Sequence, residues 1–227
     1  MDAVASAVLC GLAAVTGALT YYLRCHLPHM IEERTRDSFR AFSRAVELRF
    51  PNHEGLTSRV IPLSLAVGRR LGLPARRLRN LELAAQLRDI GLCSVPYKLI
   101  NGKSFVRWTE GDKEAYFKHV ETSARMLEQI RSLRHLAPIV RHHHANLDDD
   151  ENRPGHRSFK LSLESRILKA VGDYVWSERW QGEMLARTYL EQGSGSVYDP
   201  AVLAALSDVL TSSRVAEPAA ELVPAPY

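Results

Sequence analysis

Residues that could bind a metal ion occur at separate points along the chain. Asp89 ends one run of helix-forming residues, His119 lies inside a second, His143 and His144 close a third, and Asp173 lies inside a fourth. Neutral imidazoles and carboxylates are ligands that divalent transition metals accept in proteins. Each residue alone also has an ordinary structural explanation, such as packing, complementing a helix end or pairing with an arginine. A metal site therefore depends on a fold that brings them together.

The elements that would position these residues are helices, because apolar residues recur at helical spacing and no segment alternates with the period of a strand. Glycine and proline mark the turns between them, as in "GLPAR" at 72–76. The expected class is all-α. Helices are predicted at residues 29–50, 58–73, 75–90, 110–130, 162–180 and 200–210, with a short one at Pro138, and the polar stretch "NLDDDENRPGHRS" is predicted to be a loop.

The composition excludes several classes of protein. With 45% hydrophobic and 25% charged residues the chain can form a core and is not a disordered polymer. The net charge of +4 is small and the arginines are scattered, which argues against a nucleic-acid polymer as partner. Three cysteines fit no zinc or CxxC spacing, so neither a disulfide framework nor a cysteine metal site is expected.

The first segment differs from the rest because residues 3–23 contain no charge and are long enough to cross a bilayer. Tyr21 and Tyr22 would lie at the membrane interface, and Arg24 follows them. Asp2 in place of basic residues argues against a cleaved signal peptide. We expect a transmembrane anchor at 1–24, a connecting helix at 25–50, a cytoplasmic domain at 51–212 and a flexible tail at 213–227, at the bacterial inner membrane. Small residues at four-residue spacing in the anchor would allow a homodimer.

Five segments together resemble the HD superfamily of metal-dependent phosphohydrolases, in its HD-GYP branch of cyclic-di-GMP phosphodiesterases. The resemblance covers roughly residues 45–200. The segments are "FPNHEGLTSRV" at 50–60, "LAAQLRDIGLCSVP" at 83–96, "KHVETSARML" at 118–127, "IVRHHHANLDDD" at 139–150 and "SRILKAVGDYV" at 165–175. The resemblance implies an HD-domain helical bundle in which Asp89 bridges two divalent metals, iron or manganese. It implies His119, His143 and His144 as further ligands, and Asp173 as the last one.

The chain departs from the family pattern at several of these positions. Leu56 and Arg88 stand where the family has metal-binding histidines, and Leu92 and Ala145 replace its lysine and glutamate. "DDDENRP" occupies the place of the GYP motif, and Asp173 comes one residue later than the family's spacing from Arg166. His53 lies three residues before Leu56, and a shift of the loop would be needed for it to take over as ligand.

Arg88 is the most informative departure, because its guanidinium would pair with Asp89 and oppose the entry of a metal ion. We therefore expect one divalent metal at a residual site, or none. The leading interpretation is a degenerate, membrane-anchored module for nucleotide sensing or protein interaction, with Arg88 binding a cyclic dinucleotide and with little or no phosphodiesterase activity. An active phosphohydrolase with a rearranged site, in which Asp89 is catalytic, is the alternative. A helical scaffold that dimerises through the anchor is the third interpretation.

Overall fold

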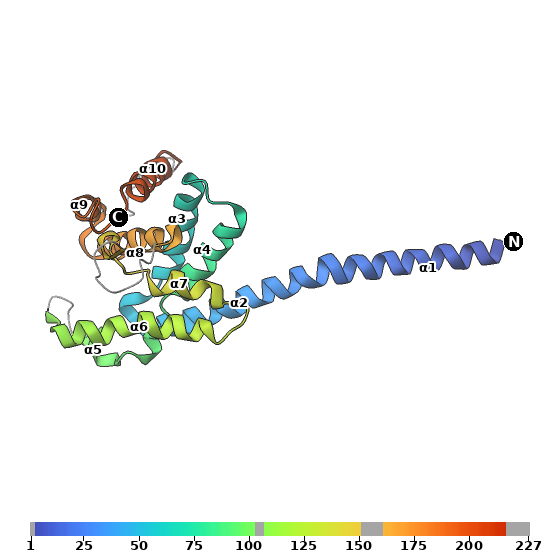
Figure 1. The fold of residues 1–227 in the computed structure, drawn as a ribbon, viewed down its shortest axis with the longest axis horizontal. Helices are drawn as coiled ribbons and strands as arrows, with labels where there is room; N and C mark the ends of the chain where they lie inside the picture. The colour runs from blue at the N-terminus through green and yellow to red at the C-terminus, as the bar shows by residue number, and fades with distance from the viewer. Residues whose placement is uncertain (1–2, 103–106, 151–160, 217–227) are drawn as a thin grey trace, which may run out of the picture. The chain divides into compact units, whose positions relative to one another are not determined.

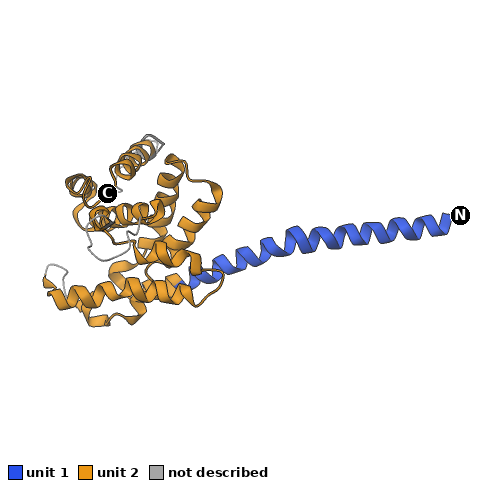
Figure 2. Cartoon of the chain, in the orientation of Figure 1, with its two compact units in different colours: residues 1–42 blue, residues 43–227 orange. Residues whose placement is uncertain are grey.

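The structure, a computed structural model, describes residues 3–102, 107–150 and 161–216 (Figure 1). The described residues form helices and short helical turns, and the only β-type pairing among them is an isolated bridge between Ser194 and Tyr198. The all-α prediction is confirmed. The chain divides into two compact units, residues 1–42 and 43–227 (Figure 2).

The first unit is a helix that continues into the second. Helix α1, Ala3–Tyr21, is followed by a wider π-helical turn, Tyr22–His26, and by α2, Leu27–Leu48. The wide turn lies just before Pro28, whose ring crowds the preceding turn and which has no N–H group to donate. The N–H of Leu27 bonds to the carbonyl of Tyr22, five residues back, which is the spacing of a π-turn.

None of the side chains of α1 is buried. The helix from Ala3 to Leu48 is long and apolar enough to cross a membrane, although a signal sequence near an N-terminus has the same length and composition.

The second unit contains the remaining helices. They are α3 (Leu56–Arg70), α4 (Ala75–Leu87), α5 (Tyr97–Gly102), α6 (Glu110–Glu128), α7 (Ala137–Arg141), α8 (Leu163–Gln181), α9 (Glu183–Gln192) and α10 (Pro200–Ala216).

Helix α8 supplies much of the core of this unit. Its N-terminus is capped by Ser162, whose side chain accepts the N–H of Ser165. Ile167, Leu168 and Val171 recur at helical spacing and are fully buried. This face packs against α3, while α9 packs against α8 as well. The predicted helix at 162–180 is thus present, one residue displaced.

The differences from the predicted helices have local causes. The helix predicted to reach residue 90 ends at Leu87, and a tight turn, Ile90–Ser94, packs on α6 instead. Helices α5 and α9 are too short to give a clear apolar period. Helix α10 extends to Ala216, into the predicted tail. In the predicted polar loop, residues 147–150 form a short helical turn, and residues 151–158 of the loop, like the tail beyond 216, lie outside the described residues.

Candidate metal centre

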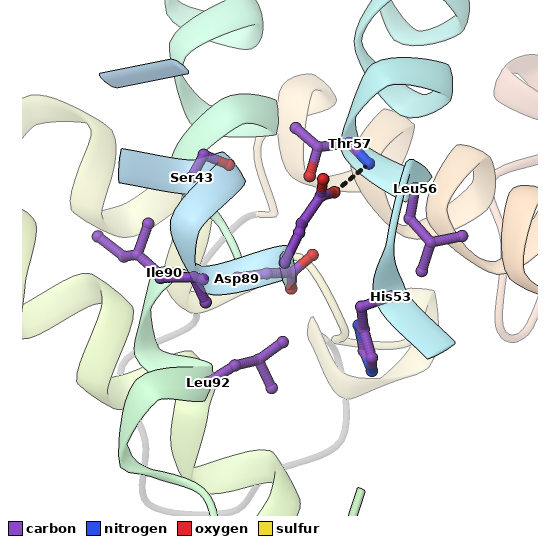
Figure 3. A pocket seen from close by; sticks show the side chains of 9 residues that line it. Ser43, His53, Leu56, Thr57, Asp89, Ile90 and Leu92 are labelled. Atoms are coloured by element: carbon purple, nitrogen blue, oxygen red, sulfur yellow. Dashed lines mark hydrogen bonds between the residues drawn. The ribbon is translucent and has the colours of Figure 1, made fainter. Parts of the chain in front are cut away.

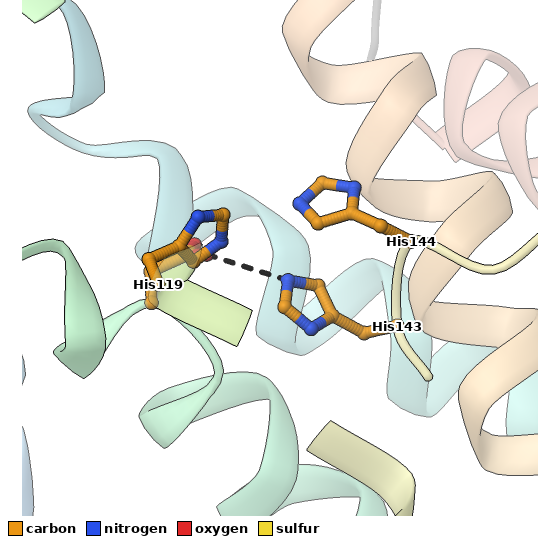
Figure 4. A group of neighbouring side chains, drawn as sticks. His119, His143 and His144 are labelled. Carbon is orange, nitrogen blue, oxygen red and sulfur yellow. Dashed lines mark ion pairs between the residues drawn. The ribbon is translucent and has the colours of Figure 1, made fainter. Parts of the chain in front are cut away.

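Four of the five candidate residues converge in the second unit. Asp89, His119, His143 and His144 each offer a ligand atom, and these atoms lie within 4.8 Å of one another. Figure 4 shows the three imidazoles turned toward a common space. His119 comes from the middle of α6, whereas His143 and His144 follow the end of α7. Three separate segments of the chain therefore meet at this point.

Gly91 allows the segment that carries Asp89 to approach α6. Its N–H donates to the hydroxyl of Ser123 at 2.8 Å. A Cβ atom at residue 91 would collide with the carbonyl oxygen of His119 and would lie 2.7 Å from the N and Oγ atoms of Ser123. Glycine is needed here for close approach of two backbones, and this contact places Asp89 beside His119.

The histidine tautomers follow from local hydrogen bonds. Nδ1 of His119 lies 2.7 Å from the carbonyl of Tyr116, and Nδ1 of His143 lies 2.6 Å from the carbonyl of Val140. A carbonyl oxygen only accepts, so Nδ1 carries the proton in both rings and each Nε2 presents a lone pair. This is the arrangement in which proteins orient metal-binding histidines.

These lone pairs point at a carboxylate. Nε2 of His119 and Nε2 of His143 each lie 3.6 Å from Oδ1 of Asp89, beyond a normal hydrogen bond. Both Nε2 atoms are buried and have no hydrogen-bond partner among the described residues. Three acceptors thus face one another without a donor between them. Such an arrangement is satisfied by a cation, and the donor set of imidazoles and one carboxylate fits a divalent transition metal.

The charge states suit the same role. Burial alone would raise the pKa of Asp89, but the adjacent Arg88 guanidinium holds that pKa well below its usual range. Burial lowers the pKa of His143, and it lowers the pKa of His144 well below the usual value. A carboxylate and neutral imidazoles are the forms that bind a metal.

Arg88 occupies the other side of Asp89. Its Nε donates to Oδ2 of Asp89 at 2.8 Å, and its side chain is only 7% exposed. Nη1 of the same guanidinium lies 2.5 Å from the point that a Cβ atom at Gly172 would occupy. One carboxylate oxygen of Asp89 therefore faces the imidazoles, while the second is taken by a fixed positive charge.

Asp173 is not part of the group of four. Its carboxylate accepts the hydroxyl of Tyr198 at 2.8 Å and pairs with Lys169 at 2.7 Å. The family spacing counted from Arg166 falls one residue earlier, on Gly172, which has no side chain to offer. Gly172 was not singled out from the sequence, although the spacing counted from Arg166 falls on it.

Leu56 and His53 line a small cavity next to Asp89, with room for about one water molecule (Figure 3). Leu56 is buried at the first turn of α3. His53 is buried as well, and burial lowers its pKa to about 4, although the charge of Asp89 acts in the opposite direction. His53 lies outside the group of four.

Glu47 lines the same cavity and was not singled out from the sequence. Its Oε1 accepts the N–H of Thr57 at 2.7 Å in the first turn of α3, and the dashed line at Thr57 in Figure 3 marks this bond. No local pattern marks this contact, because ten residues separate the partners.

Comparison with known proteins places this geometry in context. A family model described as "HD domain" matches residues 40–202. The cyclic di-GMP phosphodiesterase response regulator RpfG of Xanthomonas campestris is 27% identical over 186 residues, covering 78% of this chain and 48% of the relative. The cyclic di-GMP phosphodiesterase PA4108 of Pseudomonas aeruginosa is 30% identical over 123 residues, covering 53% of this chain and 29% of the relative. The chain thus spans about half or less of the length of these relatives.

Solved structures share the fold. A cyclic GMP-AMP-specific phosphodiesterase of Vibrio cholerae matches with a TM-score of 0.59 and 14% identity, over 78% of this chain and 48% of that one. Bd1817 of Bdellovibrio bacteriovorus matches with a TM-score of 0.56 and 18% identity, over 72% and 53%. The PgpH HD domain of Listeria monocytogenes, solved with cyclic-di-AMP, matches with a TM-score of 0.54 and 13% identity, over 82% and 100%.

Proposed function

This chain belongs to the HD domain family, and on that premise we propose that it is a degenerate, membrane-anchored member with one residual metal centre. In this proposal the centre binds a cyclic dinucleotide and hydrolyses it slowly or not at all. The cyclic dinucleotide is proposed because two curated relatives are named cyclic di-GMP phosphodiesterases and one structural neighbour was solved with cyclic-di-AMP.

The observation that carries the proposal is that three acceptor atoms meet at Asp89 with no hydrogen-bond donor between them among the described residues. His119 and His143 direct buried Nε2 lone pairs at Oδ1 of the same carboxylate, with His144 beside them. Asp89, His119, His143 and His144 would hold one divalent ion, iron or manganese. When bound, such an ion supplies Lewis-acid stabilisation of negative charge on a phosphoryl group. The backbone carbonyls of Tyr116 and Val140 keep two of the imidazoles oriented for this task.

Low activity follows from what surrounds the second oxygen of Asp89. Two-metal hydrolysis of phosphodiesters needs ligands on both sides of a shared carboxylate. Leu56, which lines the cavity beside Asp89, has no ligand atom, and Gly172 has no side chain. Arg88 brings a positive charge to Oδ2 of Asp89 and lies against Gly172. A second cation would have to enter against that guanidinium.

The membrane anchor is a further part of the proposal. It is supported by the uncharged residues 3–23, by the exposure of every side chain of α1, and by the arginines that follow at 24, 34 and 36. Basic residues after a single span favour a cytoplasmic location for the following domain.

Metal analysis of the purified full-length chain in detergent tests the proposal. We expect about one iron or manganese ion per chain and negligible turnover of cyclic-di-GMP. The variant His143→Ala should lose most of the metal, whereas His135→Ala, which changes an exposed histidine bonded to Asn80, should keep it. Two ions per chain together with rapid turnover would contradict the proposal. So would a metal-free parent that stays empty after incubation with Mn²⁺ or Fe²⁺.

A slow hydrolase that uses the single centre is the second candidate, favoured by the complete set of four ligand atoms at Asp89. It predicts that Asp89→Ala and His143→Ala abolish a measurable hydrolysis while the circular dichroism spectrum stays that of the parent. Unchanged hydrolysis in both variants would exclude it.

A further inference from the structure

We propose that Arg88 and the bare backbone of Gly172 form an anion subsite that holds one phosphate group of a phosphodiester ligand without the help of a metal ion. The inference rests on the proposed function, because the phosphodiester is the ligand proposed above. It adds the residues that would bind the phosphate group of that ligand.

The guanidinium is fixed and largely unsatisfied. An arginine presents five N–H donors, and in Arg88 only Nε–H has an acceptor among the described residues, namely Oδ2 of Asp89. Nη1 and Nη2 thus carry four N–H groups without a partner in that part of the chain. The side chain is only 7% exposed, yet neither Nη1 nor Nη2 is among the fully buried atoms that have no hydrogen-bond partner, so both can be reached from solvent. A phosphate group offers two oxygens in the spacing of the guanidinium fork.

Gly172 gives the guanidinium its place. The residue lies in the interior of α8, where glycine is less favourable for the helix than alanine. It does not have the positive φ that would require glycine, unlike Gly55 or Gly182. What requires glycine is the guanidinium, because a Cβ atom would lie 2.5 Å from Nη1 and 3.5 Å from Cζ of Arg88. The missing side chain of Gly172 therefore leaves the space in which the guanidinium of Arg88 packs.

A second cation lies on the same side of α8. Lys169 precedes Gly172 by three residues, so the two share a helix face. Its side chain is 13% exposed and pairs with Asp173, and its charge contributes to lowering the pKa of His144, which places it near the centre. Arg88 and Lys169 are each neutralised by one aspartate, so an anion binding at the free Nη groups does not meet an uncompensated carboxylate.

The test uses the full-length chain in detergent after removal of metal with a chelator, titrated by calorimetry with cyclic-di-GMP and, separately, with inorganic phosphate. Two variants disturb the subsite while they keep its charge. Arg88→Lys removes the fork, and Gly172→Ala displaces it by adding one carbon. The matched control is Gly111→Ala, a helical glycine whose added Cβ would meet only Thr109 Oγ1 at 3.9 Å.

We expect the metal-free parent and Gly111→Ala to bind cyclic-di-GMP equally. Arg88→Lys and Gly172→Ala should each weaken it by about tenfold or more, the usual effect of losing charge-assisted hydrogen bonds. Because each variant acts through a different residue, misfolding of one leaves the other as the test. Equal affinity for cyclic-di-GMP and inorganic phosphate supports the subsite and assigns it to a single phosphate group. Tighter binding of cyclic-di-GMP supports it and assigns the rest of the affinity to the nucleoside parts.

Failure of the metal-free parent to bind either probe would overturn the inference, as would parental affinity in both variants. Metal content, measured on the same preparations, separates this outcome from failure of the proposed function. A parent that retains metal but binds phosphate only in the metal-loaded form overturns the anion subsite and leaves the metal centre intact. A parent that binds phosphate through Arg88 but never takes up metal overturns the metal centre and supports the subsite.

Discussion

The backbone of Gly91 lies against the turn of α6 that carries His119, so close that no Cβ atom fits between them. The contact is between main chains, which cannot move aside as a flexible side chain can. Asp89, two residues before Gly91, owes its position beside His119 to this approach.

Gly91→Ala should therefore destabilise the protein and disturb the centre. We expect a loss of about 1–3 kcal/mol in the free energy of unfolding, typical of overpacking, together with reduced metal content. Chemical denaturation and metal analysis check both effects. Gly102→Ala, where an added Cβ meets nothing within 4 Å, is the control. Parental stability in Gly91→Ala would show that α6 can move away.

Arg88→Gln should bind a metal ion more tightly than the parent, because it removes a positive charge that is bonded directly to the carboxylate ligand. A unit charge a few ångströms away changes the free energy of ion binding enough to predict at least about a tenfold gain. Titration with Mn²⁺ against a fluorescent chelator measures it. Arg125→Gln, an exposed arginine on α6, should leave the affinity unchanged. A weaker affinity in Arg88→Gln would mean that the guanidinium orients Asp89 more than it repels the ion.

His53 should make the protein less stable at mildly acidic pH. Its pKa falls from 6.5 to about 4 on folding because the ring is buried. Between these two values the unfolded chain binds a proton that the folded chain excludes, so stability falls as the pH drops through this window. The loss between pH 7 and pH 5 amounts to about 2 kcal/mol. The variant His53→Gln should lose that much less over the same range, as measured by urea denaturation at both pH values. An identical pH dependence in the variant would contradict the assignment.

Glu47 should stabilise the start of α3 from a distance. Its carboxylate accepts the N–H of Thr57 and places a negative charge near the positive end of the helix dipole. Glu47→Ala should lower the free energy of unfolding by about 1–2 kcal/mol, whereas Glu114→Ala, an exposed residue of α6, should change it by less than about 0.5 kcal/mol. Thermal denaturation compares the two. Equal melting temperatures would show that water replaces the carboxylate.

The anchor proposal predicts that the full-length chain stays in the membrane fraction after an alkaline wash. A chain that lacks residues 1–26 should be released. An epitope tag at the N-terminus distinguishes an anchor from a cleaved signal sequence, because only an anchor keeps the tag on the membrane-bound protein. Loss of the tag would contradict the proposal.

The sequence was a good guide to those parts of the fold that depend on local pattern. The apolar period of residues 162–180 predicted α8, and the family resemblance implied that the histidines at 119, 143 and 144 meet Asp89, where their ligand atoms lie close together. Two short helices were not predicted, because α5 has only 6 residues and α9 only 10, which are too few for a clear apolar period.

Relations between distant residues were harder to predict. Asp173 was expected as a ligand from the family resemblance, but its partners Lys169 and Tyr198 are set by how α8 packs near the start of α10. The fit between Arg88 and Gly172 joins two residues that carry no shared motif, and it becomes visible only once α8 and the turn after α4 are in place.

The hydrogen bonds that orient His119 and His143 have a consequence for how the protein is made. Each ring is held by a carbonyl three residues earlier in its own segment, and Asp89 already has Arg88 as its counter-charge. Both arrangements are formed by groups of the chain itself and do not require a bound ion. On the proposed function, a newly synthesised chain would fold in a metal-starved cell and take up an ion later, so that metal supply would govern its occupancy more than its abundance.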